Sequence, residues 1–277
     1  MTTETPLNDT ALWDGLHGII RSRIGGWRVG EDILIHGHGL LSELLGEVSY
    51  VQLLVLNVTG RLPERRVADW IEGTFMCLSW PDARIWCNQV ATYAGTLRAS
   101  PVAAVSAGML ASESRLYGPG TALAATGFIV GALRSHREGR TPAEIVAGFR
   151  RDHRTRAIPG FGRPVARGDE RVVAMKRLAL RLGFAVGSHL ALADAVESVL
   201  MDEAGESMNL AGYITAFLVD FSYSAEEIHA IYAICVQGGL LACYREASTG
   251  AADSFMPMRV DDIQYTGPAP RRWDAAD

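Results

Sequence analysis

Residues 49–63 read SYVQLLVLNVTGRLP, and this stretch contains both ends of a helix. Ser49 followed by Gln52 makes a capping box, in which the serine oxygen accepts a backbone N–H and the glutamine side chain reaches back to the cap. Gly60 can adopt the left-handed conformation that closes a helix. Pro63 suits the first position of a following helix, where its missing N–H is not needed. The stretch therefore predicts one helix that ends at Gly60 and a second that starts at Pro63.

The same capping pattern recurs further along the chain. The segments that carry it are Thr141-Pro142-Ala143-Glu144 and Ser224-Ala225-Glu226-Glu227. Apolar residues at helical spacing continue through residues 171–201 and 226–247. These signals predict a mainly α protein with about a dozen helices.

Signals for β-strands are confined to the start of the chain. Residues 19–24 and 33–35 are rich in isoleucine, and they flank a glycine-rich turn that contains Gly25, Gly26 and Gly30. Two such runs around a turn predict one β-hairpin. The fold class is therefore predicted as mainly α with a small N-terminal β-hairpin.

Length and composition fit a globular protein that does not bind nucleic acid. The chain has 277 residues, of which 48% are hydrophobic and 21% charged, so it is long enough for a sizeable core. Its formal net charge is -5. A surface for nucleic acid needs a basic field, so this charge balance argues against that class of partner.

The sequence gives no sign of export or of a membrane anchor. The N-terminal residues MTTETPLNDT are polar and acidic, unlike a signal peptide. The longest apolar run, at residues 119–133, is shorter than the about 18 residues that span a bilayer. The four cysteines show no paired spacing and lie in apolar stretches, which favours buried, reduced thiols. We expect a cytoplasmic protein.

Seven short segments, in order over nearly the whole chain, share residues with one family of enzymes. They lie at residues 33–46, 53–63, 103–110, 158–162, 209–212, 239–242 and 265–268. Two of them read Ile158-Pro159-Gly160-Phe161-Gly162, similar to the family's I-P-G-F-G loop, and Asn209-Leu210-Ala211-Gly212, similar to its N-V-D-G. The chain resembles the short citrate synthase and citryl-CoA lyase family.

The resemblance implies a fold and a chemistry. The fold is a two-domain helical one, with a large domain at residues 1–118 and 223–277, a small domain at residues 119–222, and a homodimer as the assembly. In the family, an aspartate removes a proton from an acyl-CoA methyl group and a histidine stabilises the resulting enolate. A second histidine polarises the keto-acid carbonyl, and arginines hold the substrate carboxylates. No cofactor is required, since the coenzyme A thioester is itself a substrate.

Three positions of that machinery are changed in this sequence. The aspartate base corresponds to Ala211, the enolate-stabilising histidine to Tyr117 and the carbonyl-polarising histidine to Arg163. Alanine cannot accept a proton, and arginine stays protonated at any relevant pH. We therefore expect neither citrate synthesis nor citryl-CoA cleavage.

Other positions implied by the resemblance are partly kept. Arg171 matches an arginine that holds a substrate carboxylate, and Arg167 matches a basic residue near the CoA phosphates. Asn209 and Arg259 align with further substrate-binding positions. Trp80 stands where the family has another substrate histidine, which suggests a more apolar ligand or simply a core position.

Arg163 and Tyr117 each allow two interpretations. Arg163 could bind a carboxylate, a phosphate or an enolate as a bidentate fork, or it could fill the pocket while paired with a structural acid. Tyr117 could donate a hydrogen bond to an enolate-like oxygen in a dry site, or it could close an abandoned pocket.

His36 and His38 occupy the arginine and tyrosine positions of the family's R-G-Y motif. If the strand at residues 33–35 continues through them, both project on one face. They could then supply a catalytic base in place of Ala211, or two ligands of a metal, although the sequence offers no third ligand and we predict no metal site. Surface or capping histidines are the ordinary alternative.

Two functions follow from these exchanges. In the first, the protein is a repurposed enzyme of a specialised biosynthetic pathway that acts on a carboxylated or enolisable substrate, with an acyl thioester among the candidates. Arg163 and Tyr117 are then its hydrogen-bonding and electrophilic groups, and Arg171 is its carboxylate anchor. The second function is favoured by Ala211 and by Val236, which replaces another arginine. It is a non-catalytic pseudoenzyme, either a ligand-binding protein or the heterodimer partner of an active paralogue.

Overall fold

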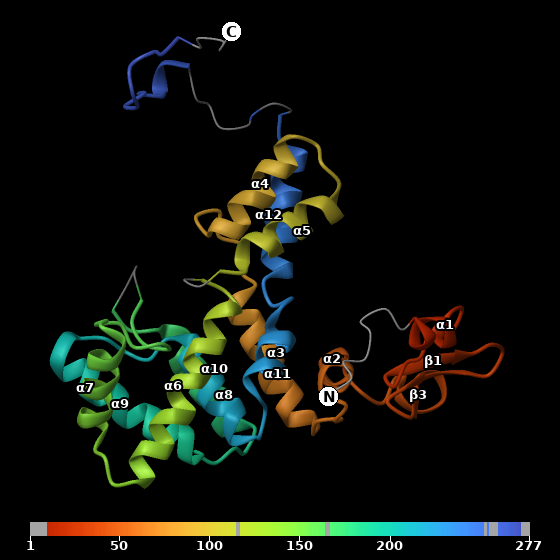
Figure 1. The fold of residues 1–277 in the computed structure, drawn as a ribbon, viewed down its shortest axis with the longest axis horizontal. Coiled ribbons are helices and arrows are strands. Elements are labelled where there is room, and N and C mark those ends of the chain that lie inside the picture. Colours follow the sequence, from red (N-terminus) through yellow and green to blue (C-terminus); the bar gives the residue numbers. More distant parts are fainter. Residues whose placement is uncertain (1–9, 115–116, 164–166, 252–253, 255–259, 273–277) are drawn as a thin grey trace, which may run out of the picture. The chain divides into compact units, whose positions relative to one another are not determined.

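The computed structural model describes residues 10–114, 117–163, 167–251, 254 and 260–272 (Figure 1). In these ranges the chain forms twelve α-helices and one three-stranded sheet, so the prediction of a mainly α fold is confirmed. The chain divides into two compact units. The first is made of Met1–Cys77 and Pro119–Ala233, and the second of Leu78–Gly118 and Ile234–Asp277. The large and small domains that the resemblance implies stay a prediction.

A small antiparallel sheet lies near the start of the first unit. The elements there are α1 (Ala11–Leu16), β1 (Gly25–Arg28), β2 (Asp32–Ile35), β3 (His38–Gly39) and the π-helical turn η1 (Leu40–Leu44). The hairpin is confirmed, but the prediction for its first strand is wrong, because residues 19–24 precede the strand and Gly25 pairs within it. A Cβ on Gly25 would lie 2.6 Å from the Leu34 carbonyl oxygen, so glycine permits this close backbone approach. The turn uses Gly30, whose φ is +80°.

Eight helices make up the other described part of the first unit, with the last residue of α3, Leu78, assigned to the second unit. They are α2 (Tyr50–Thr59), α3 (Arg65–Leu78), α6 (Gly120–Arg137), α7 (Pro142–His153), α8 (Glu170–Arg181), α9 (Ser188–Ala204), α10 (Leu210–Asp220) and α11 (Ala225–Tyr232). The capping boxes predicted at Ser49, Thr141 and Ser224 are all present. Gly60 closes α2 with a φ of 71°. Local capping chemistry therefore predicts these helix ends correctly.

One helix start is wrong in detail, and two periodic stretches are each divided between two helices. α3 begins after Pro63, whose carbonyl oxygen accepts a hydrogen bond from the Gln52 side chain of α2 (3.0 Å) and so stays in the connection. The periodic stretch at residues 171–201 forms two helices, α8 and α9, separated by a turn in which Gly183 has a φ of +73°. The stretch at residues 226–247 is likewise divided between α11 and a later helix.

The core of the first unit surrounds α10. Most residues of α10 are buried, and α6, α8, α9 and α11 contact it. The ring of Trp70 stacks on that of Phe217 at a centroid distance of 3.8 Å. Burial raises the pKa of Tyr213 to about 12, so this phenol is neutral within the core. The start of α10 is thereby fixed in position, and the candidate site is built around it.

The second unit is built from α4 (Trp86–Thr96), α5 (Pro101–Ser112) and α12 (Gln237–Thr249), with the 3-10 turn η2 (Val260–Asp262) later in the chain (Figure 1). α12 packs on both α4 and α5. A Cβ on Gly95 would lie 2.7 Å from the Tyr244 carbonyl oxygen, and one on Gly108 would lie 2.6 Å from the Leu240 side chain. Glycine therefore lets these helices approach closely. All four cysteines are free thiols, and those in this unit are buried: Cys87, Cys235 and Cys243.

One stretch of the described helices, Ala225–Thr249, passes a length and composition test for a membrane span. It consists of α11 and α12 with a turn between them, and 44% of the tested window is buried inside the structure. Buried core helices pass the same test, so the stretch is only a weak indication of a membrane. The expected absence of a membrane segment stays a prediction.

Candidate functional site

The loop that contains Gly160 is held against the start of α10 by its backbone. Phe161 and Met208 form an isolated antiparallel bridge, and the Asn209 N–H donates to the Gly160 carbonyl oxygen (3.0 Å). Gly160 has a φ of +88°, and a Cβ on Gly212 would lie 2.1 Å from the Gly160 carbonyl oxygen. Both glycines are therefore required where the loop crosses the helix.

The side chain of Asn209 holds the same junction together. Its Oδ1 accepts the N–H of Gly212 and caps α10 (3.1 Å), while its Nδ2 donates to the Gly162 carbonyl oxygen (2.9 Å). Ala211 follows in the first turn of α10, where it is half-buried. The position at which the resemblance implies a catalytic base thus carries only a methyl group.

A buried carboxylate, that of Asp169, ties the starts of two helices together. Its side chain is 0% exposed. Its Oδ1 caps α8 by accepting the Arg171 N–H (3.1 Å), and its Oδ2 accepts the Leu210 N–H of α10 (3.0 Å). The guanidinium of Arg171 binds both oxygens, through Nε at 2.8 Å and Nη2 at 2.7 Å. The sequence-based site did not include Asp169, although an aspartate two residues before Arg171 suits the cap of a helix.

The neighbours of Asp169 keep it ionised. Burial alone raises the pKa of this carboxyl, but the hydrogen bond and charge of Arg171, and then the charge of Arg163, outweigh burial and hold the pKa below its usual value. With its acceptor positions filled, Asp169 is a poor proton acceptor. It does not replace the base that Ala211 lacks.

Arg163 and Arg171 flank this carboxylate and are both largely buried. The Arg163 side chain is 16% exposed, and its Nη1 donates to Glu170 Oε2 at 2.8 Å. The same nitrogen donates to the Gly168 carbonyl oxygen (3.3 Å) and lies 3.6 Å from Asp169. Arg163 uses only Nη1 for these contacts, and Arg171 uses Nε and Nη2. Arg163 therefore keeps two nitrogen atoms, and Arg171 keeps one, that bond no described side chain.

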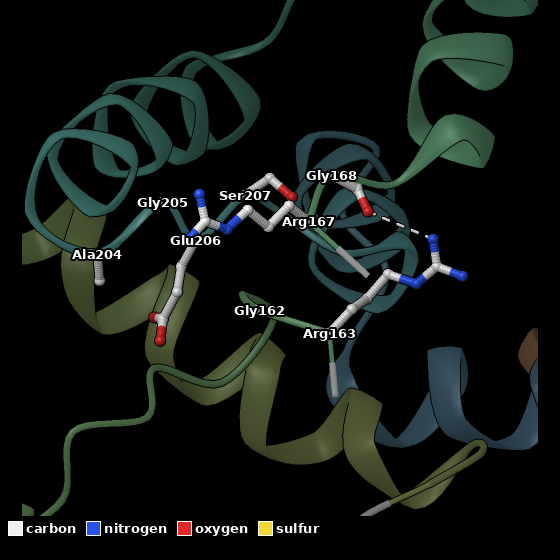
Figure 2. A pocket seen from close by; sticks show the side chains of 8 residues that line it. All are labelled: Gly162, Arg163, Arg167, Gly168, Ala204, Gly205, Glu206 and Ser207. Carbon is white, nitrogen blue, oxygen red and sulfur yellow. Dashed lines mark hydrogen bonds between the residues drawn. The ribbon is translucent and has the colours of Figure 1, made fainter. Parts of the chain in front are cut away.

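A pocket of about 330 Å³ opens beside Arg163 in the first unit (Figure 2). Its lining consists of Gly162, Arg163, Arg167, Gly168, Ala204, Gly205, Glu206 and Ser207. Arg167 is exposed and reaches across to Gly205. The sequence-based site did not include Glu206 and Ser207, and their closeness to Asn209 in the chain is the only signal that could have indicated them.

Tyr117 lies in the second unit, in a turn that follows α5. Its N–H donates to Ser114 Oγ (2.9 Å), and its ring makes a T-shaped contact with that of Trp86 at a centroid distance of 5.2 Å. The phenol oxygen lies 3.8 Å from the sulfur of Cys87. Burial raises the pKa of the Cys87 thiol, and the hydrogen bond with Tyr117 opposes this shift. The turn depends on Gly118, whose φ is +79° and whose Cβ would lie 1.8 Å from a backbone oxygen of α5.

Trp80, which is 40% exposed, lies on a loop at the start of α12. On the same loop, Ser79 Oγ accepts the N–H groups of Gly238 (2.7 Å) and Gly239 (3.2 Å). This serine caps α12 from a distant part of the chain. Val236 is only 3% exposed, so a buried apolar side chain stands where the resemblance implies an arginine.

His36 and His38 lie at the sheet near the start of the chain. β2 ends at Ile35 and His36 has a positive φ of 49°, so the strand does not continue through both histidines and they do not share a strand face. His38 Nδ1 lies 2.7 Å from Glu43 Oε1, and His36 Nε2 is buried without a hydrogen bond to the described chain. The described residues contain no group of three or more His, Cys, Asp or Glu side chains that could hold a metal ion.

The structure brings part of the sequence-predicted site together. Four of its residues lie around the starts of α8 and α10: Arg163, Arg167, Arg171 and Asn209. Tyr117 and Trp80 belong to the second unit, and His36 and His38 to the sheet. Arg259 lies outside the described residues. Whether these groups act in one site stays a prediction.

Solved structures of three enzymes are similar to this chain. Citryl-CoA lyase from Hydrogenobacter thermophilus matches with a TM-score of 0.78 and 24% identity, over 92% of this chain and 98% of that one. ATP citrate lyase from Methanothrix soehngenii, in complex with citrate and coenzyme A, matches with a TM-score of 0.77 and 19% identity. That match covers 97% of this chain and 45% of the longer enzyme.

Citrate synthase from Thermoplasma acidophilum, in a ternary complex with carboxymethyl coenzyme A and oxaloacetate, matches more distantly. Its TM-score is 0.59 at 16% identity, over 82% of this chain and 59% of that one. No protein-family model and no curated protein sequence matches the chain. Identities this low establish the fold alone, and the chain therefore has the citrate synthase-like fold.

Proposed function

We propose that this protein is an enzyme that acts on a carboxylated or enolisable small molecule, and that it neither makes citrate nor cleaves citryl-CoA. The observation that carries the proposal is the start of α10, where Ala211 stands beside a cluster of guanidinium groups. The carboxylate in that cluster, Asp169, is saturated by Arg171 and by backbone N–H groups. The parent reactions would therefore lack their base at this position.

Two arginines and a tyrosine are the groups proposed to act on the substrate. Arg171 anchors a carboxylate through the nitrogen that Asp169 leaves available, and Arg163 donates to an anionic or carbonyl oxygen. Tyr117, from the second unit, donates its phenolic hydrogen to an enolate-like oxygen. His36 or His38 is the proposed proton acceptor. The remaining substrate contacts are proposed for Trp80, Asn209 and Arg259.

A coenzyme A thioester is one candidate substrate. The similar ATP citrate lyase was solved with citrate and coenzyme A, and the similar citrate synthase with carboxymethyl coenzyme A and oxaloacetate. Arg167 is exposed at the pocket and is the residue proposed to meet a CoA phosphate. We propose no other cofactor, and we place the reaction in a specialised biosynthetic pathway of the cytoplasm.

We also propose that the protein is a homodimer. α5 has no charged residue, and two of its apolar side chains, Val102 and Leu110, are 75% and 78% exposed. Trp86 on α4, in the same unit, is 58% exposed. Exposed large apolar side chains are common in contacts between subunits.

The second candidate function is a non-catalytic one, as a ligand-binding pseudoenzyme or as the heterodimer partner of an active paralogue. Two observations favour it. Val236 buries an apolar side chain where the resemblance implies an arginine. Asp169 already occupies two nitrogen atoms of Arg171, which leaves this arginine less able to hold a substrate.

Ligand binding separates the two candidates. We expect at least one member of a panel of oxo acids, dicarboxylates, acyl-CoAs and free CoA to raise Tm by several degrees, because a ligand at 100 times its Kd stabilises the folded state by about 2.7 kcal/mol. Arg171→Lys keeps a positive charge beside Asp169 but loses the planar fork, so it should weaken binding of carboxylates at least about tenfold. Scanning fluorimetry and isothermal titration calorimetry measure these effects.

Arg177→Lys is the matched control, since Arg177 is exposed on the same helix. This variant should bind every ligand as the wild-type protein does. If no member of the panel changes Tm, the enzyme proposal fails and the heterodimer partner is favoured.

A further inference from the structure

The pocket beside Arg163 holds two side chains of opposite charge that lack partners in the described parts of the chain. The side chains of Arg167 and Glu206 make no hydrogen bond or ion pair with any described residue, although the backbone N–H of Glu206 donates to the Leu200 carbonyl oxygen (3.3 Å). Arg167 crosses the pocket, while the carboxylate of Glu206 points away from the guanidinium (Figure 2). The guanidinium carbon lies 3.7 Å from where a Cβ on Gly205 would be, and the Glu206 carboxyl carbon lies 3.9 Å from where a Cβ on Gly162 would be. Both charged groups therefore lie over bare glycine backbone.

The other charges near the pocket are already neutralised. Arg163 and Arg171 share the carboxylate of Asp169, and Arg163 also pairs with the neighbouring glutamate. What remains is one guanidinium, on Arg167, and one carboxylate, on Glu206. A polyanion such as pyrophosphate needs surplus positive charge, and the Glu206 carboxylate opposes it. A ligand that carries one charge of each sign meets a partner at each end.

The size of the pocket limits the ligand further. A volume of about 330 Å³ is near the lower end for small-molecule sites. Ser207 also lines the pocket, and its hydroxyl bonds no described residue, so it offers an additional donor and acceptor. These features suit a small polar molecule.

We propose that this pocket binds a small amino-carboxylate, whose carboxylate is held by Arg167 and whose ammonium group is held by Glu206. The inference goes beyond the proposed function, because Arg171, the carboxylate anchor proposed there, does not line this pocket. It also replaces the CoA phosphate with a carboxylate as the group that Arg167 binds. It assigns Glu206 the role of recognising the positive end of the ligand. The ligand then satisfies both charges that the folded chain leaves unpaired.

A homologous series tests this proposal without knowledge of the natural ligand. The probes are the ω-amino carboxylates from glycine to 6-aminohexanoate, each compared with the acid that lacks the amine and with the amine that lacks the acid. Isothermal titration calorimetry should show at least one amino-carboxylate that binds tenfold or more tightly than both of its analogues. Glu206→Gln should remove this advantage, so that the amino-carboxylate binds no more tightly than the acid without the amine. Arg167→Gln should likewise reduce its affinity to that of the amine without the acid.

Matched controls come from exposed residues at the end of α6, away from the pocket. Arg137→Gln and Glu138→Gln should bind the probes as the wild-type protein does. The side chains of Arg167 and Glu206 bond no described residue, so variants at these two positions should keep the wild-type Tm, which scanning fluorimetry verifies.

Three results would overturn the amino-carboxylate site. In the first, no amino-carboxylate binds more tightly than its two analogues. In the second, Glu206→Gln leaves the affinity for the amino-carboxylates unchanged. In the third, the amino-carboxylates do not bind, whereas CoA and pyrophosphate do and bind more tightly to Glu206→Gln. If plain carboxylates bind through Arg171 but the amine adds nothing, the proposed function stands and this inference fails. If no carboxylate binds at all, both fail.

Discussion

Replacing Gly212 by alanine is expected to destabilise the protein by about 3 kcal/mol, at the upper end of the usual cost of overpacking. The new methyl group would clash with backbone atoms, which cannot move aside as a side chain can. The new Cβ would lie 2.1 Å from the carbonyl oxygen of Gly160 and 3.0 Å from its Cα. To make room, the loop must move away from α10 and break the hydrogen bond from the Asn209 N–H to Gly160. Urea denaturation followed by circular dichroism measures the change in the free energy of unfolding.

Gly127→Ala and Gly131→Ala are the controls for this prediction. Both glycines lie in α6, are exposed, and have nothing within 4 Å of an added Cβ. Each should raise the free energy of unfolding by about 0.5–1 kcal/mol, since alanine favours a helix interior over glycine. A Gly212→Ala protein as stable as these controls would contradict the backbone crossing that positions the site.

Asp169→Asn is expected to cost about 3–5 kcal/mol of unfolding free energy, because it removes a buried negative charge and leaves its main cationic partner, Arg171, uncompensated. The carboxylate is 0% exposed and is bound by Arg171, with Arg163 at 3.6 Å. Because asparagine fills nearly the same volume as aspartate, the loss of unfolding free energy reports the missing charge and not a change in packing. Asp202→Asn, at an exposed position in α9, is the control and should change stability by less than about 0.5 kcal/mol.

The effect of Asp169→Asn should depend on pH in a defined direction. The pKa of Asp169 lies below its usual value of 3.8 in the folded protein, since Arg171 and Arg163 outweigh the effect of burial. A lowered folded-state pKa gives stability that is fully present above roughly pH 5 and is lost as the pH falls through the folded-state value. The difference between the wild-type protein and the variant should therefore be constant from neutral pH to roughly pH 5 and should shrink below pH 4. A difference that grows on acidification would contradict this account.

Helix ends were predictable from the sequence wherever their chemistry is local. Ser49, Thr141 and Ser224 each find their capping partner three residues away, so a short motif contains the whole interaction. The hairpin was predictable as an element but not in its first strand. Gly25 belongs to the strand because it approaches the backbone of Leu34, and that contact is not visible in the local pattern.

The candidate site was predictable only in part, for the same reason. The resemblance aligns Arg163, Arg171 and Asn209 with a site, and the structure places them around the starts of α8 and α10. Asp169 was missed because its hydrogen bond to Leu210 joins residues 41 positions apart. Glu206 was missed because it stands out only through a side chain that bonds no described residue, and no spacing rule in the sequence reveals this.

We infer that the altered site does not carry out the reactions of citrate synthase or citryl-CoA lyase. General-base catalysis alone contributes about 10²–10⁴-fold and an oxyanion-stabilising donor about 10²–10³-fold, so the loss of both removes most of the rate. The purified protein is incubated with acetyl-CoA and oxaloacetate, and separately with citryl-CoA, and the products are quantified by mass spectrometry. The citryl-CoA lyase of Hydrogenobacter thermophilus serves as the positive control for cleavage. We predict no citrate from acetyl-CoA and oxaloacetate, and no oxaloacetate from citryl-CoA, above the blank without protein. Citrate formation that depends on the protein and is lost in Arg163→Ala would contradict the account.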